Sequence, residues 1–134
     1  MSMYSYIQCD EMEQINSLPA PICAPDADET ADISLLQAKL LDMKTAISLS
    51  EIFKALSDPT RLRLISLLAE NEVCVHTLEA AMGMTQSAVS HQLRYLRQLG
   101  IVRYRKEGRH VYYAIEDEHV QMLFEQGLLH ARHR

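Results

Sequence analysis

Three features of the sequence predict a mainly α-helical fold that carries one β-hairpin, the arrangement known as a winged helix-turn-helix. A short helix over 76–82 is followed by a glycine break and by a second helix over 86–99. The next residues alternate between apolar and basic over 101–106, turn at 107–108, and continue as a strand over 109–115. A hairpin that follows the second helix of a helix-turn-helix is the wing of a winged helix.

The second helix is expected to have one polar and one apolar face. At about 100° per residue, its polar residues share roughly 140° of arc, and Val89, Leu93 and Leu96 fall on the opposite side. Thr85 is a suitable N-cap, and Gly100 is suited to end the helix. An ordinary surface helix has the same two faces, but hydroxyl, amide and guanidinium groups can also bind base edges and phosphates. The candidate DNA-contacting residues of this face are Gln86, Ser87, Ser90, His91, Arg94 and Arg97.

Basic side chains of the predicted wing form the second part of a candidate DNA surface. From Thr85 to Tyr113 the chain has six Lys and Arg residues and one acidic residue, although its net charge is −5. Local charge governs attraction to phosphate more than the total charge does. Charged residues also protect the exposed edges of hairpins, which is the alternative explanation. The wing residues expected to contact phosphate or the minor groove are Arg103, Arg105, Lys106, Arg109 and His110.

The length and the proline pattern indicate one domain over 33–134, preceded by a flexible acidic arm over 1–32. Residues 1–56 hold nine acidic and three basic side chains, and three prolines interrupt the arm. Further helices are expected over 33–43, 46–56, 60–69 and 116–133, with a break at 57–59.

The expected partners are a second copy of the chain and double-stranded DNA. Hydrophobic residues make up 48% of the sequence, which leaves apolar surface for a partner subunit. Helices at both ends of a winged helix are suited to pairing, and a homodimer matches the symmetry of palindromic operators. No segment has the apolar length of a membrane span, and the N-terminus lacks the basic and apolar regions of a signal peptide. These features predict a cytoplasmic protein.

Three cysteines, an odd number, are better explained as free thiols or metal ligands than as a disulfide framework. Cys74 and His76, at the start of the first predicted helix of the pair, are residue types that bind Zn²⁺ as thiolate and neutral imidazole. Two ligands hold a metal weakly, so Cys9 and Cys23 of the arm are candidates to complete the site. Alternatively, Cys74 is a small buried hydrophobe and His76 a surface residue.

The last predicted helix carries a second candidate metal site. His119 and His130 lie on one face within about 20°, but they are about 16 Å apart along the helix axis. Two antiparallel copies of the helix would bring the Asp117 and His119 end of one copy to the His130 and His133 end of the other. Oxygen and imidazole ligands in a closed set favour Zn²⁺. Alternatively, Asp117 caps the helix and the histidines complement the helix dipole.

Several runs of residues, taken in order, resemble the ArsR/SmtB family of metal-sensing winged-helix repressors. They are ALSDPTRLRL over 55–64, VCV over 73–75, QSAVSHQL over 86–93 and GRHVYY over 108–113. The resemblance is closest to the SmtB- and ZiaR-like zinc sensors of cyanobacteria. It implies a dimer that binds operator DNA when metal-free and releases it when Zn(II) binds, with Cd(II) and Pb(II) as further candidates. It also implies control of a gene for metal efflux or sequestration.

The resemblance assigns roles to the metal-ligand candidates. The family's soft-metal site combines a Cys-Val-Cys helix with cysteines of the N-terminal arm. In this chain His76 replaces the second Cys, and Thr77 replaces the Asp that often follows, which makes the site less purely thiolate and favours zinc. The family's C-terminal Asp-x-His and His-x-x-Glu pattern corresponds to Asp117, His119, His130 and, in place of Glu, His133.

A thiol-based redox sensor with the same fold is the alternative function, since Cys9, Cys23 and Cys74 are available for oxidation. That alternative predicts release of DNA by oxidant and no effect of zinc under reducing conditions. An enzyme is not expected. The chain has no His-Glu-x-x-His motif and no glycine-rich phosphate loop, and no nucleophile elbow surrounds Ser87 and His91.

Overall fold

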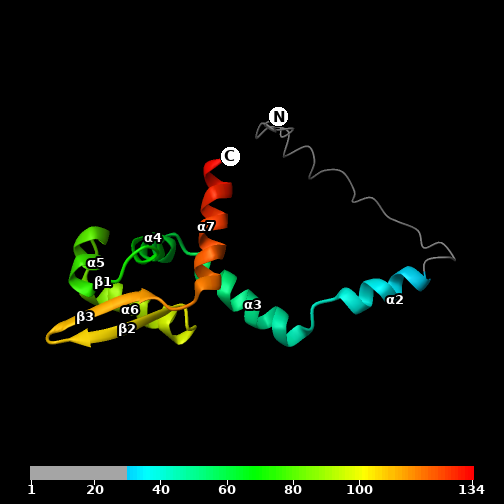
Figure 1. Cartoon of the computed structure of the whole chain (residues 1–134), viewed down its shortest axis with the longest axis horizontal. Coiled ribbons are helices and arrows are strands. Elements are labelled where there is room, and N and C mark those ends of the chain that lie inside the picture. Colours follow the sequence, from blue (N-terminus) through cyan, green and yellow to red (C-terminus); the bar gives the residue numbers. More distant parts are fainter. Residues whose placement is uncertain (1–29) are drawn as a thin grey trace. The chain divides into compact units, whose positions relative to one another are not determined.

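The computed structural model describes residues 30–134 of the chain. One break, after Leu40, divides the chain into two units. The described part of the first unit is helix α2 (Thr30–Lys39), and all other elements belong to the second unit (Figure 1). The predicted arm thiols, Cys9 and Cys23, lie outside the described residues.

Helix α3 (Met43–Leu56) begins where Asp42 supplies an N-cap. The Oδ1 atom of Asp42 accepts a hydrogen bond from the Thr45 backbone N–H at 3.0 Å. Hydrogen bonds from the side chain and the backbone of Thr45 hold the pKa of the Asp42 carboxyl below its usual value. The predicted limits of the first two helices, 33–43 and 46–56, are wrong because the chain breaks at this cap.

Helix α4 (Pro59–Leu68) begins at the predicted break, with a proline at its first position. Asp58 is the N-cap and accepts a hydrogen bond from the Arg61 backbone N–H at 2.9 Å. The Arg61 side chain turns back to α3, where Nε donates to the Ala55 carbonyl at 2.7 Å and Nη2 donates to the Lys54 carbonyl at 3.0 Å. Both carbonyls lie in the last turn of α3, where the Lys54 carbonyl also accepts hydrogen bonds from Ser57, and the two Arg61 contacts fix the corner.

The predicted helix-turn-helix is present as α5 (Val75–Met82) and α6 (Gln86–Gln98). Gly83 ends α5 with a φ of 63°, in the left-handed region that glycine adopts without a steric penalty. Thr85 caps α6 as predicted, since its Oγ1 accepts a backbone N–H from the first turn at 3.2 Å. Gly100, with a φ of 70°, follows the end of α6 as predicted.

Strands β2 (Val102–Glu107) and β3 (His110–Ile115) form the predicted hairpin. Glu107 and His110 face each other across the ladder, so the turn is Gly108-Arg109, one residue later than predicted. Gly108 has a φ of 58°, which fits the first loop position of a type II′ turn. Figure 1 shows the hairpin extending away from α6 as a wing.

A third strand, β1 (Val73–Cys74), was not expected from the sequence. Its two residues pair antiparallel with β3, opposite Tyr113 and Tyr112, and the strand order is β1-β3-β2. Directly opposed residues of an antiparallel pair share a face, and residues two apart on one strand do so as well. Cys74, Tyr112 and His110 therefore lie on the same face of the sheet.

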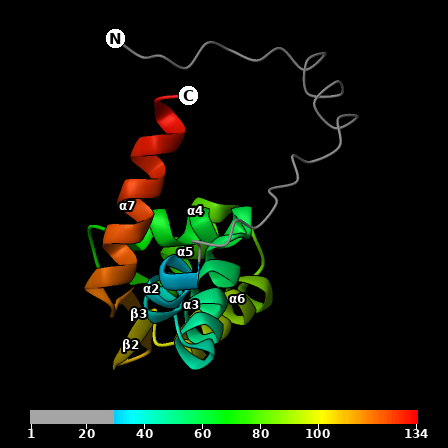
Figure 2. The same cartoon turned by 90° about the vertical axis from the view of Figure 1, so that its right-hand side faces the viewer.

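Helix α7 (Glu118–Arg132) is shorter than the predicted span of 116–133 because Asp117 caps it. Asp117 Oδ1 accepts hydrogen bonds from the backbone N–H groups of His119 at 2.8 Å and Val120 at 3.4 Å. Figure 2 shows the C-terminal half of α7 projecting beyond α4 and α6. None of the helices in the described part of the chain is long and apolar enough to cross a membrane.

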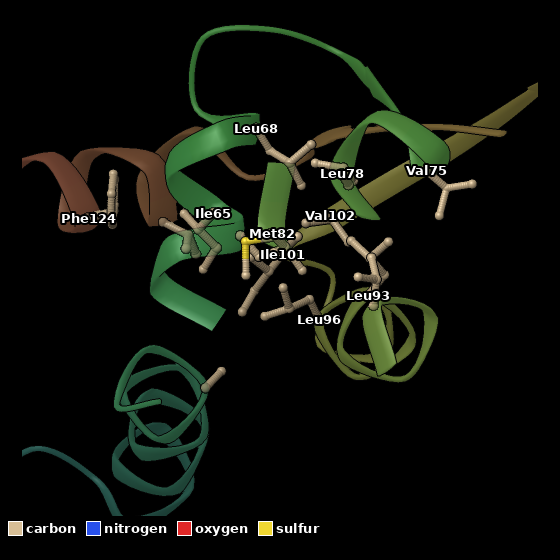
Figure 3. Close-up of a cluster of buried hydrophobic side chains, with 14 residues drawn as sticks. Ile65, Leu68, Val75, Leu78, Met82, Leu93, Leu96, Ile101, Val102 and Phe124 are labelled. Atoms are coloured by element: carbon tan, nitrogen blue, oxygen red, sulfur yellow. The ribbon is translucent and has the colours of Figure 1, made fainter. Parts of the chain in front are cut away.

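The hydrophobic core lies where α4, α5 and α6 meet, next to the start of β2 and the first half of α7 (Figure 3). Among the described residues, no polar or charged residue is buried. Helix α6 contributes Val89, Leu93 and Leu96, none more than 1% exposed, so its polar face is turned outward. The other large core residues are Leu64, Ile65, Leu68, Val75, Leu78, Met82, Ile101, Val102, Val120 and Phe124.

We expect L93A to lower the free energy of unfolding by about 2–5 kcal/mol, because it removes a fully buried side chain and leaves a cavity. Urea unfolding at a fixed protein concentration measures the change. R94A is the matched control, since Arg94 is exposed on the same helix. Equal losses in the two variants would contradict the assignment of the two faces.

Candidate DNA-contacting surface and metal-ligand pairs

The polar face of α6 is exposed because the opposite face is packed in the core. Ser90 is half-buried, and the Arg97 guanidinium lies 4.5 Å from the centre of the Tyr104 ring on β2. Arg97 therefore connects the end of α6 to the wing through a cation–π contact. The exposed residues of this face are Gln86, Ser87, His91, Arg94 and Arg97.

The basic residues of the wing differ in how far they are neutralised. The Nη1 atom of Arg103 lies 3.3 Å from Oε2 of Glu116. Arg105 pairs with two carboxylates, through Nε with Glu72 at 2.5 Å and through Nη1 with Glu107 at 2.6 Å. The Arg105 guanidinium also covers the Tyr112 ring at 4.5 Å. Arg105 thus braces the wing against the residue before β1.

Lys106 and Arg109 are exposed and make no ion pair with any residue in the part of the chain that the structure describes. They are therefore the wing cations best placed to meet an external phosphate. The sequence pattern predicted both of them as DNA contacts, but it predicted Arg105 equally. The pairing of Arg105 with Glu72 could not be seen from the pattern, because the two residues are 33 positions apart.

The ion pairs of Arg105 shift two pKa values. The hydrogen bond and the charge of Arg105 hold the pKa of the Glu107 carboxyl below its usual value. In return, the hydrogen bonds to Glu107 and then to Glu72 raise the pKa of Arg105 above its already high value. Both shifts favour the charged forms of Arg105 and Glu107, which are the forms that make this bracing contact.

Cys74 occupies a junction, as the last residue of β1 and the N-cap residue of α5. Its thiol is free and half-buried, and its Sγ lies 3.7 Å from Nδ1 of His110 on β3. The rings of His76 and His110 are 6.5 Å apart and nearly perpendicular, at 88°. The two predicted ligands Cys74 and His76 therefore lie next to a third candidate, His110, that sequence reasoning had placed only in the wing.

Glu79 is a neighbour that the sequence analysis did not select. Its Oε1 atom is buried without a hydrogen-bond partner and lies 3.9 Å from Nδ1 of His76, beyond hydrogen-bond distance. Within residues 30–134, no three His, Cys, Asp or Glu side chains converge closely enough to enclose a metal ion as they stand. The separation of Cys74 and His110 nevertheless fits shared coordination, because a thiolate and an imidazole in a tetrahedral zinc site are about 3.6 Å apart.

The Asp117 and His119 side chains form a second pair, at the start of α7. Asp117 Oδ1 lies 3.3 Å from Nδ1 of His119, close to the roughly 3.3 Å expected between oxygen and nitrogen ligands of tetrahedral zinc. The same oxygen also caps α7, so Asp117 Oδ1 is both a helix cap and a candidate metal ligand. His130 and His133 are exposed at the opposite end of α7, and one chain does not bring the two pairs together.

An apolar groove of about 560 Å³ runs between α3, α4 and α7. It is open to solvent, and large apolar side chains remain exposed along it, including Phe53 at 51% and Leu123 at 39%. An exposed apolar surface of this kind marks an interaction site. The lining residues are Phe53, Leu56, Leu62, Arg63, Ser66, Leu123, Phe124, Gly127, Leu128, Ala131 and Arg132.

The arrangement of α5, α6 and the wing defines the class of protein, a winged helix-turn-helix regulator. Two solved structures share it. The crystal structure of the AntR antimony-specific transcriptional repressor has a TM-score of 0.66 and 37% identity, covering 70% of this chain and 86% of that one. A homodimeric winged helix-turn-helix DNA-binding domain from Mycobacterium bovis has a TM-score of 0.62 and 34% identity, covering 69% and 88%.

The chain belongs to the ArsR family. Residues 58–104 match the family described as bacterial regulatory protein, arsR family. A transcriptional repressor SmtB homolog of Synechocystis is 43% identical over 106 residues, covering 79% of this chain and 80% of that relative. A cadmium resistance transcriptional regulatory protein CadC homolog of Staphylococcus aureus is 42% identical over 95 residues, covering 70% and 78%. These relatives are transcriptional regulators, and the chain is a regulator rather than an enzyme.

We expect the pKa of the Glu107 carboxyl to rise towards its usual value in R105Q, because the substitution removes the ion pair. Carboxyl chemical shifts followed by NMR over a pH series measure it, with R103Q as control. Since the folded-state pKa is lowered, the pair stabilises the wing above the ordinary carboxyl pKa and is lost as the pH falls through the lowered value. A Glu107 titration unchanged in R105Q would contradict the bracing role of Arg105.

Proposed function

We propose that this protein is a metal-responsive transcriptional repressor whose metal-free homodimer binds operator DNA and is released by Zn(II), with Cd(II) and Pb(II) as further candidates. Its regulated gene encodes a metal efflux or sequestration protein. The observation that carries the proposal is the position of Cys74 and His76, which are ligand-type residues at the start of the helix that precedes α6. The similarity to a transcriptional repressor SmtB homolog and to a cadmium resistance regulator supports it.

The proposed DNA surface combines the polar face of α6 with the free cations of the wing. Short polar groups and guanidinium groups on an exposed helix suit hydrogen bonds to base edges in the major groove. Lys106 and Arg109 suit phosphate contacts, whereas Arg105 and Arg97 act by holding the wing against the domain. The proposed base-contacting residues are Gln86, Ser87, Ser90, His91 and Arg94.

The proposed homodimer uses the apolar groove and the exposed side of α7. The metal ligands favour a second copy of the chain as the partner that covers this groove. Within one chain, His119 and His130 are about 16 Å apart along the helix, too far to bind the same ion. An antiparallel contact between two α7 helices would place His130 and His133 of the partner subunit beside that pair. The apolar residues along the groove and the exposed Leu129 supply the contact area.

The proposed metal ligands are of two kinds. Cys74 and His76, with Cys9 and Cys23 of the arm, would form a mixed thiolate and imidazole site. Oxygen and imidazole ligands would form the site between two α7 helices, from Asp117, His119, His130 and His133. Zinc accepts both ligand sets, whereas softer metals favour the one with thiolates. When bound, the metal supplies a rigid link between these side chains.

Redox sensing is the second candidate function, and one contact favours it. The Cys74 thiol is free and lies 3.7 Å from Nδ1 of His110, so a thiol that an oxidant could modify stands where β1 meets α5. Release of DNA by peroxide under metal-free conditions, without release by zinc under reducing conditions, would identify this function.

We expect K106Q to weaken binding to the promoter fragment of the chain's own locus and to reduce the slope of log K against log salt by about 1. R105Q is the comparison, because Arg105 is already neutralised by two carboxylates and should change the slope less. Fluorescence anisotropy at several salt concentrations measures both. Slopes reduced equally in the two variants would contradict the division of roles in the wing.

We expect the metal-free forms of C74S and of the H130A/H133A double variant to bind the promoter fragment as the wild type does. Each variant removes ligands from one site only. The variant that lacks the ligands of a regulatory site should therefore lose zinc-induced release of DNA. Zinc titration of the protein–DNA complex, followed by anisotropy, measures the release. Wild-type release in both variants would overturn the assignment of these ligands.

A further inference from the structure

We propose that His110 of the wing is a metal ligand together with Cys74 and His76, so that a divalent cation of the zinc class joins the wing directly to α5. The inference rests on the proposed function and adds as a ligand a residue that the sequence pattern had assigned to the DNA-contacting wing. It starts from the unexpected strand β1, which brings the metal-ligand helix and the wing into one sheet.

The pairing of β1 with β3 positions the first two ligands. Cys74 lies opposite Tyr112, and His110 lies two residues before Tyr112 on the same face. The two side chains meet there with Cys74 Sγ at 3.7 Å from His110 Nδ1. This separation is within about 0.1 Å of the value expected for sulfur and nitrogen ligands of one tetrahedral zinc ion. Backbone hydrogen bonds of the sheet thus hold two ligands in position before any metal arrives.

The third ligand, His76, stands in the first turn of α5 with its side chain 61% exposed. Its ring is 6.5 Å from that of His110, so rotation of an unhindered side chain can turn a ring nitrogen towards the other two ligands. Glu79, one turn further along α5, explains how the ring would be held. Its buried, unpartnered Oε1 is 3.9 Å from His76 Nδ1 and would accept the Nδ1–H as the ring turns. Carboxylates that orient zinc-bound histidines in this way are common.

The position of these ligands gives a short route from metal to DNA. Cys74 and His110 are 36 positions apart in the sequence, and the segment between them includes the whole of α6 and β2. A metal that joins the two ends of this segment fixes the wing relative to the helix pair. Glu107, opposite His110 across the ladder, is already paired with Arg105, so it does not compete strongly for the cation.

The test uses the full-length reduced protein in the H130A/H133A background, which leaves this site as the one to be measured. Zinc affinity is measured by competition with a chromophoric chelator, and Co²⁺ absorption reports ligand type and geometry. We expect H110Q to lower zinc affinity at least tenfold, since even the loss of an orienting partner costs about 10–100-fold. We expect E79Q to lower it less, and H110C to restore tight binding with stronger thiolate-to-cobalt absorption.

H91Q is the matched control, because it removes an exposed imidazole from α6 instead of the wing, and its zinc affinity should be unchanged. Thermal unfolding of each metal-free variant verifies the fold. Wild-type zinc affinity and cobalt spectrum in H110Q, together with loss of both in C74S, would overturn the role of His110 and leave the proposed function intact. Failure of zinc to release DNA from the wild-type protein would instead overturn the proposed function.

Discussion

The pairing of β1 with β3 is the constraint on which the rest of the structure depends. Two residues, Val73 and Cys74, add a third strand to the wing, and α5 begins at the next residue. No loop separates β1 from α5, so the pairing of β1 with β3 holds the start of α5 against the wing. The contact of Arg105 with Glu72, just before β1, reinforces the same connection from the side chains. Any group that links Cys74 to the wing therefore acts on the domain that is proposed to bind DNA.

The apolar core determines which residues face outward. Because Leu93 and Leu96 of α6 are fully buried, Arg94 and the residues around it must point to solvent. The core holds no polar side chain in the described part of the chain, so burial there comes from apolar contacts alone. Phe53 and Leu123 remain exposed beside this core, and covering them with a second copy would extend it across the proposed dimer.

Local sequence rules were sufficient for much of this architecture. Thr85 and Gly100 act through capping or turn chemistry within a few residues, and the structure has them as the sequence predicts. The amphipathic pattern of α6 also predicts its two faces, since one stripe dominates its packing. The family resemblance is confirmed, since residues 58–104 match the arsR family and a relative is 43% identical over 106 residues.

The features that could not be predicted depend on contacts distant in the chain. Strand β1 is too short to have a pattern of its own and exists because β3 is beside it. Glu72 and His110 become neighbours of Arg105 and Cys74 through that pairing, which residue spacing does not contain. The helix limits near Asp42 were wrong because a capping aspartate interrupted an otherwise continuous helical pattern. The roles of Cys9 and Cys23 remain predictions.

In the proposed function, metal and DNA oppose each other through the same domain. The most direct test measures the zinc affinity of the reduced protein twice, once free and once bound to its promoter fragment. Linkage requires that DNA lower the zinc affinity by the same factor by which zinc lowers the DNA affinity, with about 5–150-fold typical of such coupling. A zinc affinity that is lower in the complex by the matching factor is the predicted result. Equal zinc affinities in the free and DNA-bound protein would contradict the account.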